Sequence, residues 1–266
     1  MIKLIVTDLD GTFLNSQGGF DRLLFEQTRT LMASKGVHFA ACTGKQCERV
    51  EELFGELARD VWIVGDSATR IKLNGEYIYQ SLLPNDLGLR MIKTLRAASS
   101  RHVIIACTNE GAFLSSDTPA RLQEKVRASY ARVVLTDDLN SISSDFVKIT
   151  LYDEEGNCAR TLECLRPYQY QAYMVVSEAC WLDIADYGVH KGSTLQRLQK
   201  QLNVGKHETM AFGDGYNDLE LLAEAEYSFA MRNGFEETKR AANFVTGSND
   251  ESAVLETIRR LLVLQP

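Results

Sequence analysis

The chain has 266 residues, of which 45% are hydrophobic and 24% charged, and its formal net charge is −7. This composition is typical of a globular protein, and the length predicts one large domain and a smaller one. The acidic balance, without a dense cluster of lysine and arginine, excludes nucleic acid and anionic membrane surfaces as expected partners. No apolar stretch is long enough to cross a bilayer and no secretion signal is recognisable, so we expect a cytoplasmic protein.

The six cysteines include no CxxC pair, and three of them lie in apolar, strand-like runs. Reduced and mostly buried thiols are therefore expected. The four histidines are dispersed along the chain, which makes a histidine-ligated zinc site improbable.

The first part of the chain alternates between strand-like and helix-like patterns. The predicted elements are a strand through Ile2 and Leu4 to Val6, a helix from Asp21 to Lys35, a strand from Val37 to Cys42, a helix containing Val50, Leu53, Phe54 and Leu57, and a strand from Val61 to Val64. The pair Asn74-Gly75 then predicts a hairpin from Ile71 to Tyr79, because both residues tolerate the positive φ angles of a type I′ turn.

The pattern changes between about Pro84 and Tyr187, where adjacent strands alternate with helices. The predicted elements are helices at 85–99, 119–130 and 158–165 and strands at 103–107, 111–115, 146–152, 174–177 and 181–185. Paired strands with helices on one side indicate a separate α+β module inserted into the chain. We expect residues 84–187 to form this inserted domain and residues 1–83 and 188–266 to form the main domain.

The alternation resumes after the insertion. The predicted elements are a helix from Ser193 to Leu202, a strand from Thr209 to Phe212, a helix from Asp218 to Ala225, and short strands at Tyr227–Met231 and Phe244–Val245, each followed by a helix. The fold class predicted from these patterns is α/β, with a doubly wound, mostly parallel, Rossmann-like core sheet and an inserted α+β domain.

Two carboxylates follow the first predicted strand, in the segment Asp8-Leu9-Asp10-Gly11-Thr12-Phe13. Alternate residues of a strand point to one face, so Asp8 and Asp10 can converge beyond its end, and Gly11 lets the chain turn away. An open α/β sheet binds its ligands at this edge. The two acids suggest either a metal site or a division between nucleophile and proton donor, and the alternative is an acidic turn without a function.

Three further segments lie at predicted strand ends or helix starts. Thr43-Gly44-Lys45 offers a hydroxyl and backbone N–H groups, which can form either an anion cradle or an ordinary turn. Lys191 opens a helix, where its charge opposes the helix dipole and suggests an anionic partner, although a solvated surface lysine is the alternative. The segment from Gly213 through Asp214 and Asn217 to Asp218 has two acids and an amide, as is typical of a hard-cation site.

Other motifs are excluded. A dinucleotide-binding GxGxxG pattern fails because position 218 is Asp, and a calcium loop fails because Phe13 stands where glycine is required. The sequence contains no Walker A motif and no GxSxG elbow.

Taken in order, these four segments resemble the four motifs of the haloacid dehalogenase superfamily. The place of the insertion resembles the Cof-type, sugar-phosphatase-like branch, which carries a C2B-type cap. Asp8-Leu9-Asp10-Gly11-Thr12 is similar to the first motif, Thr43-Gly44 to the second, Lys191 to the third and Gly213-Asp214-x-x-Asn217-Asp218 to the fourth. The resemblance covers the whole chain.

The resemblance implies a Mg²⁺-dependent phosphohydrolase that cleaves small phosphate monoesters, such as sugar phosphates or related metabolites, through an aspartyl-phosphate. It implies that Asp8 is the nucleophile and Asp10 the general acid and base. Asp8, Asp214 and the backbone carbonyl of Asp10 would hold Mg²⁺. The remaining implied roles are binding or orientation of the phosphoryl group for Thr43, Gly44, Lys191 and Asn217, and support of the metal or of the lysine for Asp218.

The chain departs from the family pattern in two places. Asp66-Ser67-Ala68 stands where Asn-Gly-Ala is usual, and Lys45 stands where arginine is common. We hypothesise that the extra carboxylate of Asp66 faces the substrate and influences the preference for its leaving group. The inserted domain is expected to act as a lid that excludes water and contacts the leaving group.

Two other functions are compatible with these residues. A phosphomutase of the same superfamily would share every motif and would release an isomer instead of free phosphate. A non-catalytic phosphometabolite-binding protein would have no need of Asp10. The oligomeric state stays open between a monomer and a weak dimer.

Overall fold

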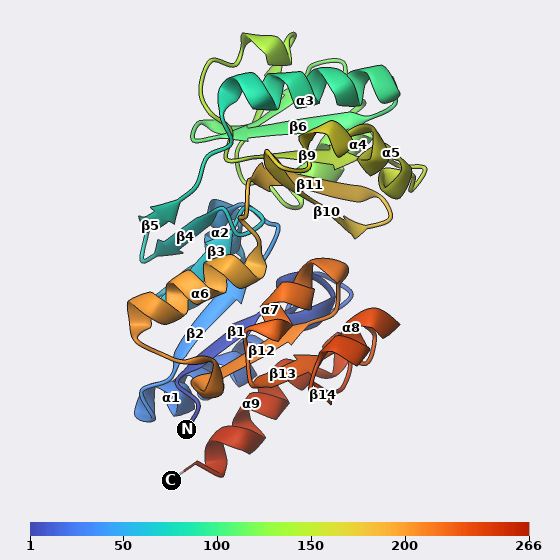
Figure 1. Cartoon of the computed structure of the whole chain (residues 1–266). Coiled ribbons are helices and arrows are strands. Elements are labelled where there is room, and N and C mark those ends of the chain that lie inside the picture. The colour runs from blue at the N-terminus through green and yellow to red at the C-terminus, as the bar shows by residue number, and fades with distance from the viewer. Residues whose placement is uncertain (266) are drawn as a thin grey trace.

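A computed structural model describes residues 1–265. Within these residues the larger sheet has the strand order β14 (Phe244–Val245), β13 (Tyr227–Ala230), β12 (Thr209–Gly213), β1 (Leu4–Thr7), β2 (His38–Cys42), β3 (Val61–Gly65), β4 (Arg70–Leu73) and β5 (Glu76–Gln80). Its strands are parallel from β14 to β3, and the hairpin β4–β5 adds an antiparallel edge. Figure 1 shows this sheet in the lower half of the molecule, with both chain termini beneath it.

Helices cover both faces of the larger sheet. One face packs on α1 (Arg22–Ser34), α2 (Cys47–Phe54) and α9 (Ala253–Val263), and the other packs on α6 (Lys191–Leu202) and α7 (Leu219–Ala223). Successive residues of β1 alternate between the two hydrophobic clusters, with Leu4 and Val6 in one and Ile5 in the other. Burial on both faces explains why the successive residues Leu4, Ile5 and Val6 of this strand are all apolar. The α/β core with a mostly parallel sheet is thus confirmed.

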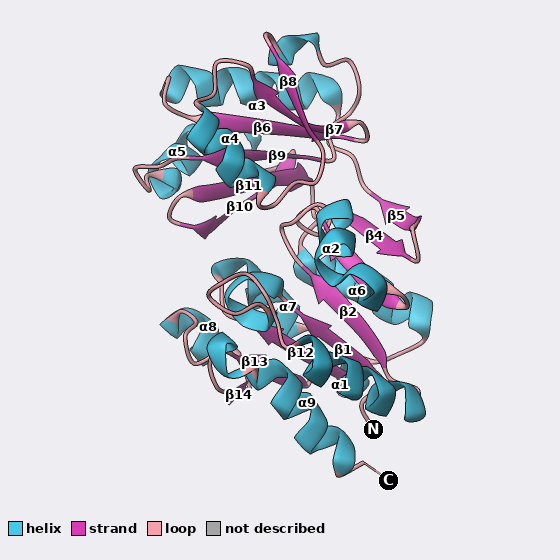
Figure 2. Ribbon diagram, turned by 180° about the vertical axis from the view of Figure 1, so that it is seen from behind, coloured by secondary structure: helices cyan, strands magenta, loops and turns pink. Residues whose placement is uncertain are grey.

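The smaller sheet has the order β10 (Ala172–Glu178), β11 (Trp181–Asp186), β9 (Lys148–Tyr152), β6 (Val103–Thr108), β7 (Gly111–Ser115) and β8 (Val133–Thr136). Residues 85–186, from α3 (Asn85–Ala98) through β11, contain this sheet and are called the cap below; residues 1–84 and 187–265 are called the core domain. Figures 1 and 2 show the cap above the core domain.

The cap differs in two respects from the sequence prediction. Helices α3 and α5 (Cys158–Cys164) pack on one face of the sheet, but α4 (Ala120–Arg127) packs on the other, so the expectation of helices on one side is wrong. Edge strand β8 was not expected. Its four residues are half-buried or exposed, and they show no clear alternation of apolar and polar residues that would mark a strand.

The predictions for the hairpin turn and for the cysteines are confirmed. Asn74 and Gly75 have φ angles of 50° and 85°, as a type I′ turn requires. All six cysteines are free, and Cys42, Cys47, Cys107 and Cys158 are buried. None of the helices in residues 1–265 has the length and apolar character needed to span a membrane.

The sheet order places the functional segments together. Strand β1 lies between β2 and β12, and the chain leaves it toward β2 on one side while β12 to β14 continue on the other. This is a topological switch point, where a crevice forms beyond the carboxyl ends of the strands. Asp8, Thr43 and Asp214 each follow one of these three strands directly.

Five phenylalanines pack together between the larger sheet and helices α1 and α2. Phe25 is fully buried, and its ring centroid lies 5.2–5.5 Å from those of Phe13, Phe20, Phe39 and Phe54.

We predict that Phe25→Ala lowers the free energy of unfolding by about 3–5 kcal/mol, because it removes a buried ring and leaves a cavity. Urea denaturation followed by circular dichroism measures the change. Phe244→Ala is the control, since that ring is 50% exposed. Equal shifts in the two variants would contradict the assignment of the cluster to the core.

Candidate active site

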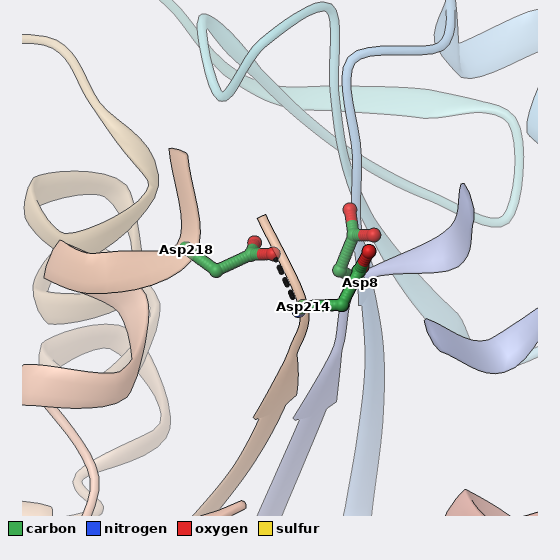
Figure 3. Close-up of side chains that lie close together, drawn as sticks. All are labelled: Asp8, Asp214 and Asp218. Carbon is green, nitrogen blue, oxygen red and sulfur yellow. Dashed lines mark hydrogen bonds between the residues drawn. The ribbon is translucent and has the colours of Figure 1, made fainter. Parts of the chain in front are cut away.

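The four sequence segments meet around one cavity of about 320 Å³ between the core domain and the cap. Six of the eight predicted site residues line it, namely Asp8, Asp10, Thr43, Gly44, Asp214 and Asn217. The other two, Lys191 and Asp218, are buried and hydrogen-bonded to this group of residues. Figure 3 shows Asp8, which follows β1, beside Asp214, with the Asp218 carboxylate of the Gly213–Asp218 segment pointing toward them.

Asp8 is held at the end of β1, where its N–H donates to the carbonyl of Phe212 over 3.0 Å. The chain then turns sharply, and Gly11 has a φ of +74°. A Cβ atom at this position would lie 2.4 Å from Oδ2 of Asp214. Glycine is therefore required both for the backbone conformation and for the close approach of Asp214.

Asp10 points to the cavity, with 54% of its side chain exposed. Its Oδ1 lies 2.9 Å from Nζ of Lys45, whose side chain is 11% exposed. An accessible carboxylate held by one cation at the mouth of a buried site is suited to carry protons to and from a ligand.

Lys191 is the central cation of the site. It begins α6, is 3% exposed, and its Nζ lies 2.6 Å from Oδ1 of Asp8 and 2.6 Å from Oδ1 of Asp218. Burial alone lowers the pKa of Lys191, but Asp218 and Asp8 raise it above its ordinary value. The side chain is therefore a fixed ammonium group beside Asp8.

Asp218 is buried and holds the Asp214 loop and Lys191 through hydrogen bonds. Its Oδ2 accepts the backbone N–H groups of Asp214 at 3.0 Å and Gly215 at 2.9 Å, and its Oδ1 accepts from Lys191. Through these hydrogen bonds the Asp218 carboxylate orients both the loop and the lysine.

Asp214 completes a group of three carboxylates whose oxygen atoms lie within 4.8 Å of one another. Burial and the charge of Asp218 raise the pKa of Asp214 to about 7, and Thr12 donates to its Oδ1 over 2.6 Å. Burial also raises the pKa of Asp8, against the opposing effect of Lys191. Clustered, desolvated carboxylates of this kind are stabilised by a cation, and a set of hard oxygen donors fits Mg²⁺.

Three of the predicted phosphate-binding residues, Thr43, Gly44 and Asn217, line the same cavity as Asp8 and Asp214. Thr43 is 1% exposed, and its Oγ1 accepts the backbone N–H of Lys45 over 3.2 Å. Asn217 lines the cavity. The close partners of the Lys191 ammonium are Asp8 and Asp218, so the structure gives no support to orientation of Lys191 by Asn217.

The hypothesis that the Asp66 carboxylate faces the substrate is wrong. Asp66 is 1% exposed, its Oδ2 accepts the N–H of Cys47 over 3.3 Å, and the same atom lies 3.7 Å from Nη1 of Arg70. It lies beneath the Thr43–Lys45 loop, outside the set of described residues that line the cavity. The sequence shows that an aspartate stands at position 66. It does not show where the side chain of Asp66 points, because that depends on a turn in which Asp66, Ser67 and Ala68 all have positive φ angles.

Sequence reasoning assigned no role to several residues that hold the site. Thr12 binds Asp214, and Lys45 binds Asp10. Both lie inside segments that had been singled out, so their polar side chains were the available signal. The cap residues that line the cavity could not be identified from the sequence, and they are Lys125, Ala128, Ser129, Tyr130, Lys148, Thr150, Ser177, Glu178, Trp181 and Asp183.

Comparisons with known proteins agree with this arrangement. A family model described as haloacid dehalogenase-like hydrolase matches residues 5–258. The 5-amino-6-(5-phospho-D-ribitylamino)uracil phosphatase YbjI of Escherichia coli K12 is 28% identical over 262 residues, which cover 98% of this chain and 96% of that protein.

Solved structures share the whole fold. A protein of Streptococcus mutans UA159 is 27% identical with a TM-score of 0.94, covering 99% of this chain and 100% of its own. A sugar phosphatase of subclass IIB of the superfamily is 17% identical with a TM-score of 0.82, and the match covers 98% of this chain and 100% of that one. At this low identity the likeness shows the fold alone. The expected phosphatase branch, with an α+β cap on a Rossmann-like core, is confirmed by these relatives. The chain therefore belongs to the haloacid dehalogenase-like hydrolase family.

Proposed function

We propose that this protein is a Mg²⁺-dependent phosphatase that transfers the phosphoryl group of a small phosphate monoester first to Asp8 and then to water. The observation that carries the proposal is that Asp8, Asp214 and the exposed carboxylate of Asp10 line one cavity, with the buried Lys191 ammonium hydrogen-bonded to Asp8. We further propose that the chain folds as two domains, an inserted domain of residues 84–187, which contains the cap, and a main domain of residues 1–83 and 188–266.

The chemical difficulty is the charge of the substrate. Phosphate monoesters hydrolyse extremely slowly without a catalyst, and catalysis depends on positioning and on positive charge around the transferring group. Lys191 supplies one fixed positive charge beside the nucleophile. Thr43 offers a hydroxyl, and the Gly44 segment and Asn217 offer further donors for the phosphoryl oxygens.

Four carboxylates, those of Asp8, Asp10, Asp214 and Asp218, gather at the reacting centre, where the ammonium groups of Lys45 and Lys191 contact Asp10 and Asp8. The donor set of Asp8, Asp214 and the backbone carbonyl of Asp10 would hold Mg²⁺. When bound, the ion supplies positive charge that reduces the repulsion between a carboxylate and an anionic ester.

The steps then follow from the protein's own groups. A carboxylate oxygen of Asp8 forms a bond to phosphorus while the bond from phosphorus to the leaving oxygen breaks, and Asp10 gives its proton to that oxygen. Asp10, now ionised, takes a proton from a water molecule, which attacks the aspartyl-phosphate and releases inorganic phosphate. The exposure of Asp10 fits both of its roles.

The cavity walls suit a small leaving group that carries hydroxyl groups. Its cap side combines the ring of Trp181 with polar groups from Thr150, Ser177 and Glu178. The relative from Escherichia coli is named for a phosphorylated ribitylamino-uracil, which has a polyhydroxylated chain attached to a ring. We propose sugar phosphates and related polyol phosphates as the substrate class, and the cytoplasm as the place of action.

Substitution of the nucleophile tests the mechanism. Asp8→Asn should abolish phosphate release, because an amide cannot form the covalent intermediate. Asp10→Asn should lower kcat by about 10²- to 10⁴-fold, the usual contribution of a general acid and base. Phosphate release from a panel of phosphate esters measures both effects, and a fully active Asp8→Asn protein would refute the assignment.

Metal removal is a separate test. Dialysis against EDTA should remove activity, because the carboxylate cluster would then repel the ester, and added Mg²⁺ should restore it. Activity that persists in EDTA at undiminished rate would exclude the proposed metal dependence.

The position of Asp66 predicts that Asp66→Asn keeps the wild-type ranking of substrates. The change should lower the free energy of unfolding by about 1–3 kcal/mol, since it weakens buried hydrogen bonds near Arg70. Relative kcat/KM values across the same ester panel, with thermal denaturation alongside, check both statements. A changed ranking would restore Asp66 as a specificity residue.

A further inference from the structure

A buried lysine of the cap reaches into the core domain. Lys148 lies on β9 and is 1% exposed, and its Nζ is 2.8 Å from the carbonyl oxygen of Gly44, 2.9 Å from Oγ of Ser67 and 3.2 Å from Oδ1 of Asp183. An ammonium group has three N–H donors, and these three acceptors use all of them. Although Lys148 lines the cavity, its charge is committed to the protein and not to a leaving group.

The cap holds this lysine in a fixed position. Oδ1 of Asp183 also accepts the hydroxyl of Thr150 over 2.7 Å, and the hydroxyl of Tyr130 donates to Thr150 over 3.0 Å. All three partners are buried. Burial alone lowers the pKa of Lys148, but Asp183 raises it above its ordinary value, so the ammonium form persists.

On the core side, Lys148 acts on the predicted phosphate-binding loop. In a trans peptide the carbonyl and the next N–H point in opposite directions, so fixing the Gly44 carbonyl also fixes the N–H of Lys45. That N–H points to Oγ1 of Thr43, the hydroxyl assigned to the phosphoryl group. The cap cation therefore orients a peptide unit inside the anion cradle.

Ser67 joins the lysine to the same loop. The Ser67 N–H donates to the carbonyl of Thr43 over 3.1 Å, and the Ser67 hydroxyl oxygen accepts a hydrogen bond from the Lys148 ammonium. The neighbouring Asp66 N–H donates to the carbonyl of Lys45 over 2.8 Å. Ser67 thus supplies to Lys148 a hydroxyl that a glycine at this position could not.

Further contacts between cap and core domain lie just after this loop. Oε1 of Gln46 accepts the N–H groups of Ala131 and Arg132 at 2.9 and 3.2 Å, and the N–H of Gln46 donates to the carbonyl of Ser129 over 2.9 Å. Gly44 and Gln46, at the two ends of this segment, are therefore both hydrogen-bonded to the cap.

We propose that Lys148 is a positioning residue that couples docking of the cap to the geometry of the phosphate-binding loop, with Ser67 as its partner in the core domain. The inference rests on the proposed function in taking Thr43 and Gly44 as the phosphate site. When the cap moves away, Lys148 and Asp183 leave together, and the Gly44 carbonyl loses its charged partner.

The test measures binding of inorganic phosphate by calorimetry, which requires no turnover, together with kcat/KM for p-nitrophenyl phosphate and for a sugar phosphate. Lys148→Met should weaken phosphate binding about tenfold to a hundredfold, the range for loss of charged hydrogen bonds. It should lower kcat/KM for both esters by a similar factor, because the loop contacts the phosphoryl group that they share. Ser67→Ala should weaken phosphate binding about threefold to tenfold.

A thermodynamic cycle separates positioning from a general loss of structure or charge. In the Lys148→Met background, Ser67→Ala should have no further effect, because its partner is already gone. Lys148→Met/Asp183→Asn, which leaves no uncompensated buried charge, should show the same weakened binding if the single variant folds poorly. Lys125→Met is the matched control for loss of charge alone, because Lys125 lies on the same cavity wall but contacts the ring of Tyr152 and not the loop. In the Lys125→Met background, Ser67→Ala should keep its full effect on phosphate binding.

Folded Lys148→Met protein that binds phosphate as the wild type does, or that loses kcat/KM for the sugar phosphate alone, would overturn the inference. Additive effects of the Lys148 and Ser67 substitutions would also overturn it. If the wild type binds phosphate but hydrolyses no ester, the proposed function fails while the binding cycle still decides the role of Lys148. A wild type that binds no phosphate contradicts both.

Discussion

The structure depends on a buried ammonium group, that of Lys191, held 2.6 Å from Asp8 and 2.6 Å from Asp218. A buried charge is costly unless it is paired, and here its two partners come from opposite ends of the core domain sequence. Strands β1 and β12 must therefore lie side by side with their ends in register. The same requirement brings Asp214 over Gly11, so one electrostatic constraint assembles the first, third and fourth segments of the site.

Much of this arrangement could be predicted from the sequence because chemistry and secondary structure coincide there. Asp8, Thr43 and Asp214 each follow an apolar strand, and parallel strands end at one edge of the sheet. The directions in which individual side chains point, and the residues that they contact, could not be predicted. The sequence led us to predict that the Asp66 carboxylate faces the substrate, but a turn of three residues with positive φ angles directs it beneath the loop. Edge strand β8 lacked the alternation that identifies a half-buried strand.

The cap residues that line the cavity could not be predicted from the sequence for a different reason. Lys148, Thr150 and Asp183 lie on two cap strands as isolated polar positions, and a polar position in a strand ordinarily faces solvent. Only the tertiary structure shows that this face of the cap sheet closes over the cavity. The core domain thus provides site residues that short sequence motifs identify. The cap provides site residues that only long-range contacts identify.

The central claim is that Asp8 carries the phosphoryl group between substrate and water. Mass spectrometry of enzyme quenched in acid during turnover tests it most directly. The account predicts that the peptide containing Asp8 gains the mass of one phosphoryl group in wild-type protein, and that Asp8→Asn protein shows no such gain. Phosphorylation of another residue during turnover, with the Asp8 peptide unmodified, would contradict it.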